Sequence, residues 1–174
     1  MTHPPFKILI CNLETAKRQA FGCDITHIIS IIDSSHNPTH HLGNLFEMRN
    51  NWRVFVFDDL EDKHRFLTKH KLATTNIIQD ILNFTKNLGE QDKILIHCHA
   101  GLCRSTAVAL LVMLQHGMTE KNALEHLISI RPKAWPNRLV LRLGDALLGT
   151  GSVHIVNEWM GKELALRISS EDIF

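Results

Sequence analysis

Residues 93–112 contain a cysteine, a glycine and an arginine at a spacing that could hold and attack an anion. The segment reads KILIHCHAGLCRSTAVALLV: a short apolar run, a loop with Cys98, Gly101 and Arg104, and a second apolar run of helical length. A loop that precedes a helix faces unpaired backbone N–H groups and the positive end of the helix dipole, so it attracts anions. The same surroundings favour the thiolate form of a cysteine. Cys98 is therefore a candidate nucleophile.

Gly101 and Arg104 add the two other parts that such a loop needs. A glycine lets the backbone turn tightly with its amides pointing inward. An arginine at the start of the helix can offer two parallel N–H donors to a phosphate, which a lysine cannot imitate. One loop thus supplies a nucleophile, an oxyanion cradle and a fixed positive charge.

Apolar periodicity places this loop in an α/β protein. The run at 25–32 is almost continuous isoleucine, which is typical of a strand covered by helices on both faces. The run at 105–116 is apolar almost all round and predicts a buried helix. Strands are expected at residues 6–11, 25–32, 52–57 and 93–97, and helices at residues 12 to about 22, 74–88, 105–116, 119–130 and 136–148. The alternation predicts an α/β fold with a largely parallel central sheet flanked by helices.

Length and composition favour one domain. The 174 residues fit a single domain, with a core at about 6–150 and a tail at 151–174 whose amphipathic stretch has no assigned place. The formal net charge of +1 gives no support for a nucleic-acid or membrane partner. No signal peptide is apparent, and no apolar run reaches the roughly 20 residues that span a bilayer. We expect a cytoplasmic protein with free cysteine thiols.

The loop also carries a family resemblance. Residues 97–105, HCHAGLCRS, match the HCxxGxxR[ST] loop of the cysteine-dependent protein tyrosine and dual-specificity phosphatases. THIISIID resembles the second strand of small bacterial tyrosine-phosphatase-like proteins, and VFVFDDL resembles the strand that leads into their general-acid loop. RPKAWPNRLVLRLGDALLG is similar to their RP-x-x-x-PN helix. The resemblance covers residues 6 to about 150.

The resemblance implies a metal-independent phosphatase without a cofactor, in which Cys98 attacks phosphorus and forms a cysteinyl-phosphate. Arg104 and the loop amides would hold the phosphate oxygens as charge spreads over them. Ser105 would hydrogen-bond the thiolate and help it leave, and His97 would be a buried orienting residue. Asn137 would brace the loop from behind, besides starting a helix. The loop residues expected to bind the substrate are His99, Ala100, Gly101, Leu102, Cys103 and Arg104.

A general acid must protonate the leaving group, and the resemblance places it after the third strand. Asp58 and Asp59 are adjacent there, and strand parity does not separate them because residues 52–57 are largely apolar on both faces. Asp59 is followed by a leucine, which fits the family order of an acidic residue and then an apolar one. We therefore expect Asp59 to be the acid, with Asp58 as the alternative and Glu61 or Asp62 behind them.

Other residues have plainer interpretations. His97, Cys98 and His99 do not make a metal set, because neighbouring strand residues point to opposite faces and no CxxC or HxxxH pair completes it. The remaining assignments are Cys11 and Cys23 to the core, His36, His40 and His41 to a solvated loop, and Arg138 and Arg142 to a solvated helix face.

Cys103 supports two hypotheses. It precedes Arg104, as a second thiol does in the low-molecular-weight tyrosine phosphatases. It could resolve an oxidised Cys98 through a disulfide, which needs Cα atoms within about 7 Å. Alternatively, it only fills space beneath the loop.

The expected function is hydrolysis of phosphate monoesters on phosphorylated proteins, with phosphotyrosine as the default and phosphoserine or phosphothreonine left open. Two alternatives stay beside it. One is a phosphate-binding module without turnover. The other is a rhodanese-type sulfurtransferase, which the pattern of Gly101, Arg104 and Ser105 disfavours.

Overall fold

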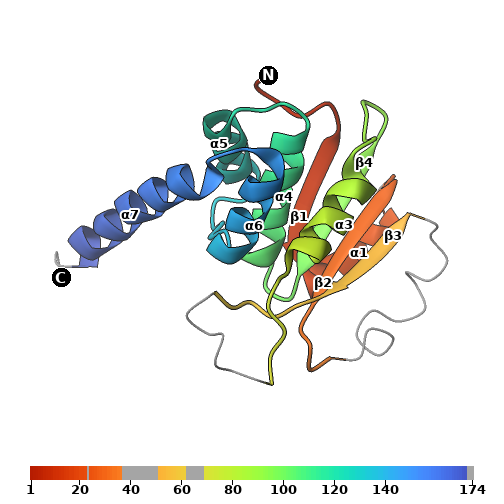
Figure 1. The fold of residues 1–174 in the computed structure, drawn as a ribbon, viewed down its shortest axis with the longest axis horizontal. Helices are drawn as coiled ribbons and strands as arrows, with labels where there is room; N and C mark the ends of the chain where they lie inside the picture. Colours follow the sequence, from red (N-terminus) through yellow and green to blue (C-terminus); the bar gives the residue numbers. More distant parts are fainter. Residues whose placement is uncertain (23, 37–50, 62–68, 172–174) are drawn as a thin grey trace.

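The computed structural model describes residues 1–22, 24–36, 51–61 and 69–171. Cys23, His40, His41 and Asp62 lie outside these ranges. Strands and helices alternate along the described chain (Figure 1). The strands are β1 (Lys7–Asn12), β2 (His27–Ile32), β3 (Trp52–Val56) and β4 (Lys93–Cys98). The helices are α1 (Leu13–Gly22), α3 (Thr75–Thr85), α4 (Arg104–Gln115), α5 (Glu120–Ile130), α6 (Arg138–Leu148) and α7 (Ser152–Glu171).

The four described strands form one parallel sheet in the order β1-β4-β2-β3. The prediction of a largely parallel central sheet is therefore confirmed. β4 lies between β1 and β2, with Asn12 opposite Cys98 and Ser30 opposite His97. Because all strands run the same way, the segments that follow them gather at one edge, where open α/β sheets bind ligands. The loop after Cys98 lies in the middle of that edge.

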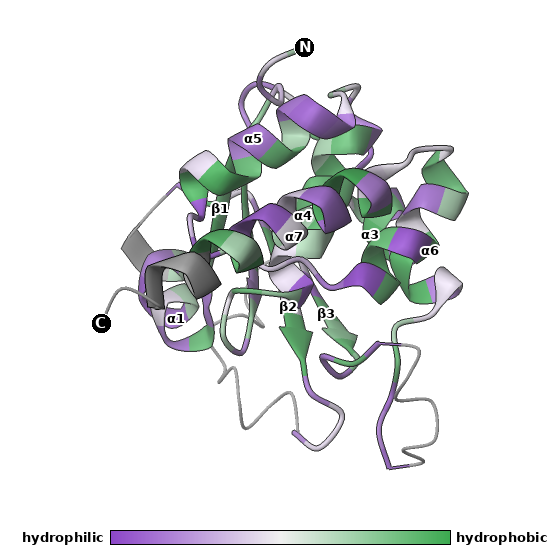
Figure 2. Ribbon diagram, turned by 90° about the vertical axis from the view of Figure 1, so that its left-hand side faces the viewer, coloured by the Kyte–Doolittle hydropathy of each residue, from purple (hydrophilic) through white to green (hydrophobic). Residues whose placement is uncertain are grey.

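β2 is buried on both faces, as its isoleucine run predicted. Ile29 and Ile31 belong to the larger hydrophobic cluster on one face, and Ile28 and Ile32 belong to a smaller cluster on the other. Figure 2 shows β2 and β3 in the green of apolar residues. Ser30 interrupts the run and is fully buried, so its hydroxyl needs a hydrogen-bond partner inside the protein.

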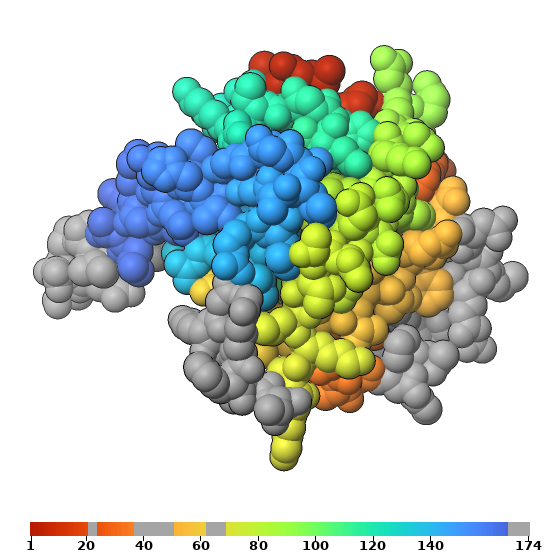
Figure 3. Space-filling model, in the orientation of Figure 1, coloured from red at the N-terminus to blue at the C-terminus, as the bar shows by residue number. Residues whose placement is uncertain are grey.

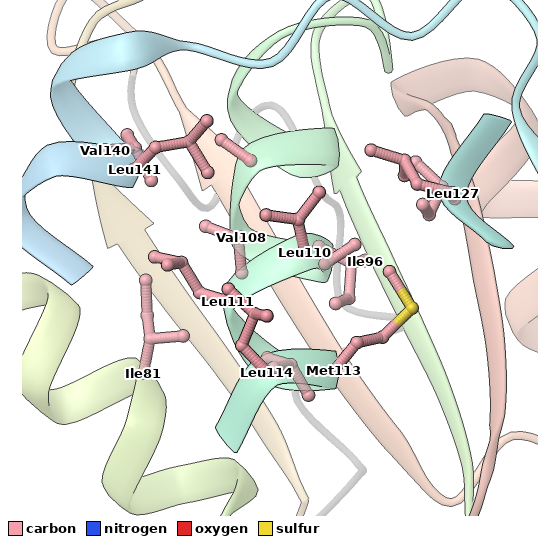
Figure 4. Packing of buried hydrophobic residues seen from close by; sticks show 14 of the residues in the cluster. Ile81, Ile96, Val108, Leu110, Leu111, Met113, Leu114, Leu127, Val140 and Leu141 are labelled. Carbon is pink, nitrogen blue, oxygen red and sulfur yellow. The ribbon is translucent and has the colours of Figure 1, made fainter. Parts of the chain in front are cut away.

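α4 is the central helix of the larger layer. Every residue of α4 except the last is buried, which explains why its sequence is apolar almost all round. Its side chains pack between Ile81 on α3, Leu127 on α5 and Val140 on α6 (Figure 4). α1 packs against β1 and β4 and contributes to the smaller cluster on the opposite face. This packing fixes the position of the first turn of α4, which contains Arg104.

Two predicted helix boundaries differ from the structure by two residues or more. α3 ends at Thr85 instead of residue 88, because the amide of Leu88 turns back onto the Thr85 carbonyl at 3.2 Å. α6 begins at Arg138 instead of Pro136, because Asn137 is its N-cap and its side-chain oxygen accepts a hydrogen bond from a backbone amide inside the helix.

The tail without a predicted place is the helix α7. It packs first on α5 and α6 and then leads away from the body of the protein (Figures 1 and 3). Leu164 and Leu166 on this helix are 52% and 63% exposed. Within the described ranges, no helix combines the length and the apolar character that crossing a bilayer requires.

Gly144 provides a test of the contact between α4 and α6. A methyl group at this position would lie 2.3 Å from the Cδ atoms of Leu111, which is fully buried. We predict that Gly144→Ala lowers the free energy of unfolding by about 1–2 kcal/mol, because overpacking costs more than helix propensity returns. Urea denaturation measures the change. Gly161→Ala on α7, with nothing within 4 Å of the new methyl group, is the control, and an equal effect of both substitutions would contradict the prediction.

Candidate active site

Cys98 is the last residue of β4, and its side chain is buried at the start of the loop. Its Sγ atom accepts a hydrogen bond from the backbone amide of Gly101 at 3.1 Å. The hydroxyl of Ser105, on the first turn of α4, lies 3.3 Å from the same sulfur. Both contacts suit a sulfur that carries negative charge, because each can place a hydrogen on it. The structure therefore places Ser105 within hydrogen-bond distance of the sulfur, and its role in releasing the thiolate stays a prediction.

The carbonyl groups of residues 99–103 all accept hydrogen bonds from outside the loop. This leaves the amides of the loop on its inner side, where an oxyanion would bind. The outer donors are the backbone amides of Leu13 to His99, Trp135 to Leu102 and Asn137 to Cys103, and the Arg131 guanidinium to Ala100 (3.3 Å) and Gly101 (2.9 Å). Arg131 belongs to the RP-x-x-x-PN pattern, which by itself gives this residue no role at the loop.

Gly101 is required at its position for two reasons. Its φ angle is +69°, in the left-handed region that favours glycine. A Cβ atom there would also lie 2.4 Å from the carbonyl carbon of Cys11 on β1. The loop therefore runs closely over the end of the neighbouring strand.

Arg104 is almost entirely buried, at 3% exposed. Its Nη1 atom donates to the carbonyl of Phe57 at 2.8 Å and forms an ion pair with Asp33 Oδ1, also at 2.8 Å. Its Nε atom is buried and has no hydrogen-bond partner within the described ranges. A buried donor of this kind is costly unless a ligand satisfies it. The Nε side of the guanidinium is therefore available for an anion.

Asp33 is a site residue that the sequence analysis missed. It directly follows β2, and its carboxylate is partly exposed beside Arg104. The available signal was an acidic residue at the end of a buried parallel strand, because such strand ends meet at the edge where Arg104 stands.

The carboxylate of Asp58 links neighbouring segments through hydrogen bonds. Its oxygens accept hydrogen bonds from the Ser34 amide and hydroxyl and from the Lys71 amide, at 2.6–2.8 Å. Burial raises the pKa of Asp58, but these hydrogen bonds and the nearby His70 outweigh burial, so the pKa lies below its ordinary value. A carboxylate that is already ionised and fully engaged cannot serve as a proton donor near neutral pH.

Asp59 is exposed and lies beside the loop that follows Cys98. Its Oδ1 atom accepts a hydrogen bond from the side-chain amide of Asn137 at 2.9 Å. Asp59, Cys103 and Asn137 line one surface hollow of about 280 Å³, with Trp135. Of the two adjacent carboxylates, Asp59 is the one whose surroundings leave it accessible.

Asn137 connects the loop with the segment that follows β3. Its backbone amide binds the Cys103 carbonyl, and its side chain caps α6 and also donates to Asp59 and to the Leu60 carbonyl. Arg138 adds a two-point contact to Glu61, at 2.8 and 2.7 Å. Arg138 is exposed, as expected, and the structure also pairs it with an acidic side chain.

Cys103 points toward Asp59 at the outer side of the loop. Burial raises the pKa of the Cys103 thiol to about 12, and a hydrogen bond with the Asp59 carboxylate acts in the same direction. A thiol that stays protonated attacks an oxidised sulfur slowly. The structure therefore favours packing and hydrogen bonding for Cys103, and the disulfide with Cys98 stays a prediction.

Two histidines lie near the loop. His97 is fully buried, and burial lowers its pKa to about 4, so its ring is neutral near pH 7. His36, expected in a solvated loop, is partly buried, and its ring stacks beside His99 with centroids 6.3 Å apart. Within the described ranges, no three or more histidine, cysteine or acidic side chains gather in a way that could hold a metal ion.

Solved structures with a similar fold are phosphatases. PTP-2 phosphatase of Cydia pomonella has a TM-score of 0.60 and 14% identity, over 80% of this chain and 84% of that one. PTPMT1 has a TM-score of 0.54 and 12% identity, over 90% and 95%. Tk-PTP in the active form has a TM-score of 0.53 and 16% identity, over 86% and 95%. At these identities the likeness concerns the fold.

Sequence comparison adds a closer relationship. Dual specificity protein phosphatase 1 of Arabidopsis thaliana is 41% identical over 120 residues, which are 68% of this chain and 53% of the relative. The chain is thus similar in sequence to a dual-specificity phosphatase, and its fold is that of solved phosphatases. It spans about half the length of this phosphatase. No family model matches the sequence.

The different surroundings of Asp58 and Asp59 give a prediction on stability. Asp58→Asn should lower the free energy of unfolding by about 2 kcal/mol at pH 7, because hydrogen bonds to a charged, buried group are worth roughly 1.5–3 kcal/mol. A lowered folded pKa stabilises the protein above the ordinary value near 3.9 and loses that effect as the pH falls through the folded pKa. The gap between wild type and variant should therefore narrow below about pH 4.

Denaturant unfolding between pH 3 and 7 measures this gap. Asp80→Asn on α3, where the aspartate is exposed, is the matched control and should leave stability nearly unchanged. A constant gap for Asp58→Asn at all pH values would contradict the structural role of its charge.

Proposed function

We propose that this chain hydrolyses phosphate monoesters, with phosphotyrosine proteins as the default substrate, through a cysteinyl-phosphate at Cys98. The observation that carries the proposal is the buried Nε donor of Arg104 without a partner in the described structure, beside a loop whose carbonyls are all bonded outward. Both features favour a tetrahedral oxyanion. The similarity to a dual-specificity phosphatase and the position of Cys98 at the start of the loop support hydrolysis over binding alone.

In the proposed first step, the Cys98 sulfur attacks phosphorus in line with the leaving oxygen. The loop amides and the free side of Arg104 hold the equatorial oxygens, where charge develops. Asp33 and the Phe57 carbonyl fix the other side of the guanidinium, so the fork does not have to reorganise during the reaction. Asp59 in its protonated form supplies a proton to the leaving oxygen.

In the proposed second step, Asp59, now a carboxylate, takes a proton from water, which attacks the phosphorus of the cysteinyl-phosphate. The sulfur–phosphorus bond breaks and the electron pair returns to Cys98. Ser105 and the Gly101 amide donate to this sulfur, which makes the thiolate a better leaving group.

A phosphate-binding module without turnover is the second candidate, and one observation favours it. The Asp59 carboxylate is engaged by Asn137, so a chain in which this contact persisted would bind phosphate without an acid to complete the reaction. The sulfurtransferase alternative requires a transferable sulfur, and a thiosulfate–cyanide assay tests it directly.

Hydrolysis of p-nitrophenyl phosphate separates these candidates. Wild type should release p-nitrophenol without added metal and in the presence of EDTA, and vanadate should inhibit it. Cys98→Ser should abolish turnover and keep vanadate binding, since the loop amides and Arg104 remain. Arg104→Lys should lose most activity because a point charge cannot replace a planar fork. Arg142→Lys, an exposed position on α6, is the matched control. Near-wild-type turnover by Cys98→Ser would reject the mechanism.

The acid is tested by the pH profile and by the leaving group. Asp59→Asn should lower kcat/KM for phenyl phosphate by roughly 10²–10⁴-fold, the usual contribution of a general acid, and flatten the basic limb of the profile. The loss should be smaller for p-nitrophenyl phosphate, whose leaving group needs less protonation. Asp80→Asn should change neither. If Asp58→Asn flattens the basic limb and Asp59→Asn does not, the acid is Asp58.

A further inference from the structure

A row of buried polar side chains crosses the sheet behind the nucleophile. Ser30 on β2 stands directly opposite His97 on β4, and their side chains meet at 2.7 Å between Oγ and Nε2. Trp52 on β3 pairs with Ile28, two residues before Ser30 and therefore on the same face of the sheet. Its indole Nε1 lies 2.9 Å from the Ser30 Oγ.

The direction of these hydrogen bonds follows from the chemistry of each group. An indole N–H can only donate, so Ser30 accepts from Trp52. The single hydrogen of the Ser30 hydroxyl then remains for His97 Nε2. Because the ring of His97 is neutral, an Nε2 that accepts leaves the one ring proton on Nδ1.

We propose that Ser30 and Trp52 are positioning residues for the nucleophile: they fix the ring of His97 in the tautomer whose Nδ1–H faces the backbone of Cys98. This inference rests on the proposed function of Cys98 as nucleophile. The contact of the His97 ring with the Cys98 backbone favours a proton on the ring, against the effect of burial. The N–H dipole on Nδ1, fixed in direction by the hydrogen bond to Ser30, then favours negative charge on the adjacent Cys98 sulfur.

Among the described residues, four further charged or titratable groups lie near this row. Cys11 on β1 stands opposite His97, and burial raises the pKa of its thiol to about 12, so it stays neutral. Lys17, on the helix α1 that covers this face of the sheet, lowers the pKa of His97 through its positive charge. Arg104 and Cys103 flank Cys98 within its own loop. None of these is altered by substituting Ser30 or Trp52, so a change in Cys98 would be transmitted through His97.

The test measures Cys98 without needing turnover. Alkylation by iodoacetamide is followed as a function of pH by mass spectrometry of the Cys98 peptide. In Ser30→Ala the midpoint pH of alkylation should rise by on the order of 0.5–1 pH unit, which is what a lost hydrogen bond of about 1 kcal/mol implies. Ser30→Thr, which keeps a hydroxyl, should restore the wild-type midpoint. Trp52→Phe should shift it in the same direction by less.

Two matched controls separate positioning from stability. Ser152→Ala removes another buried hydroxyl, which donates to Asp145 at 2.7 Å far from the loop. Trp159→Phe changes the indole that packs against Trp135. Both should lower the melting temperature without moving the midpoint pH. An unchanged midpoint in Ser30→Ala would overturn the proposal.

¹⁵N NMR of the wild-type protein provides a second measurement if Ser30→Ala does not fold. His97 should show a protonated Nδ1 and an unprotonated Nε2 from pH 6 to 8, and the opposite tautomer would overturn the proposal. Neither measurement depends on phosphatase activity. A chain that fails to hydrolyse phosphate would refute the proposed function, whereas a chain that hydrolyses phosphate with an unchanged midpoint in Ser30→Ala would refute this inference alone.

Discussion

The outward direction of five consecutive carbonyl groups is the constraint on which the rest of the site depends. A backbone can present its amides to an anion only if its carbonyls are satisfied elsewhere. Here the donors come from the start of α1 and from the segment before α6, with Arg131 serving two carbonyls. The HCxxGxxR motif therefore accounts only for the amides that face the anion. The groups that satisfy the loop carbonyls come from residues distant in sequence.

The buried charge of Arg104 sets the second constraint. An isolated buried cation is costly, and a carboxylate beside it offsets that cost. Asp33 lies next to Arg104 because the sheet order places the end of β2 beside the end of β4. The pair engages only Nη1 and leaves Nε to a ligand. The charge is thus held in position without losing its capacity to bind an anion.

Local sequence patterns predicted the strands, helices and loop, but they did not predict the contacts between residues distant in sequence. The buried β2, the apolar α4 and the loop from Cys98 to Ser105 follow from residues that are adjacent in sequence, so periodicity and the motif sufficed. Asp33 and the pair of Arg138 with Glu61 depend on which strands and helices become neighbours, which no local pattern contains. The position of the tail also depends on such neighbours, because only the first part of α7 packs on α5 and α6.

The two adjacent aspartates after β3 differ in their surroundings: Asp58 is buried and hydrogen-bonded, and Asp59 is exposed. Asp58 turns inward and ties the end of β3 to the segments that follow β2 and precede α3, through Ser34 and Lys71. The next side chain, Asp59, is exposed and accepts a hydrogen bond from Asn137 at the border of the loop. Asp58 thus anchors the segment from which Asp59, the proposed proton donor, is exposed.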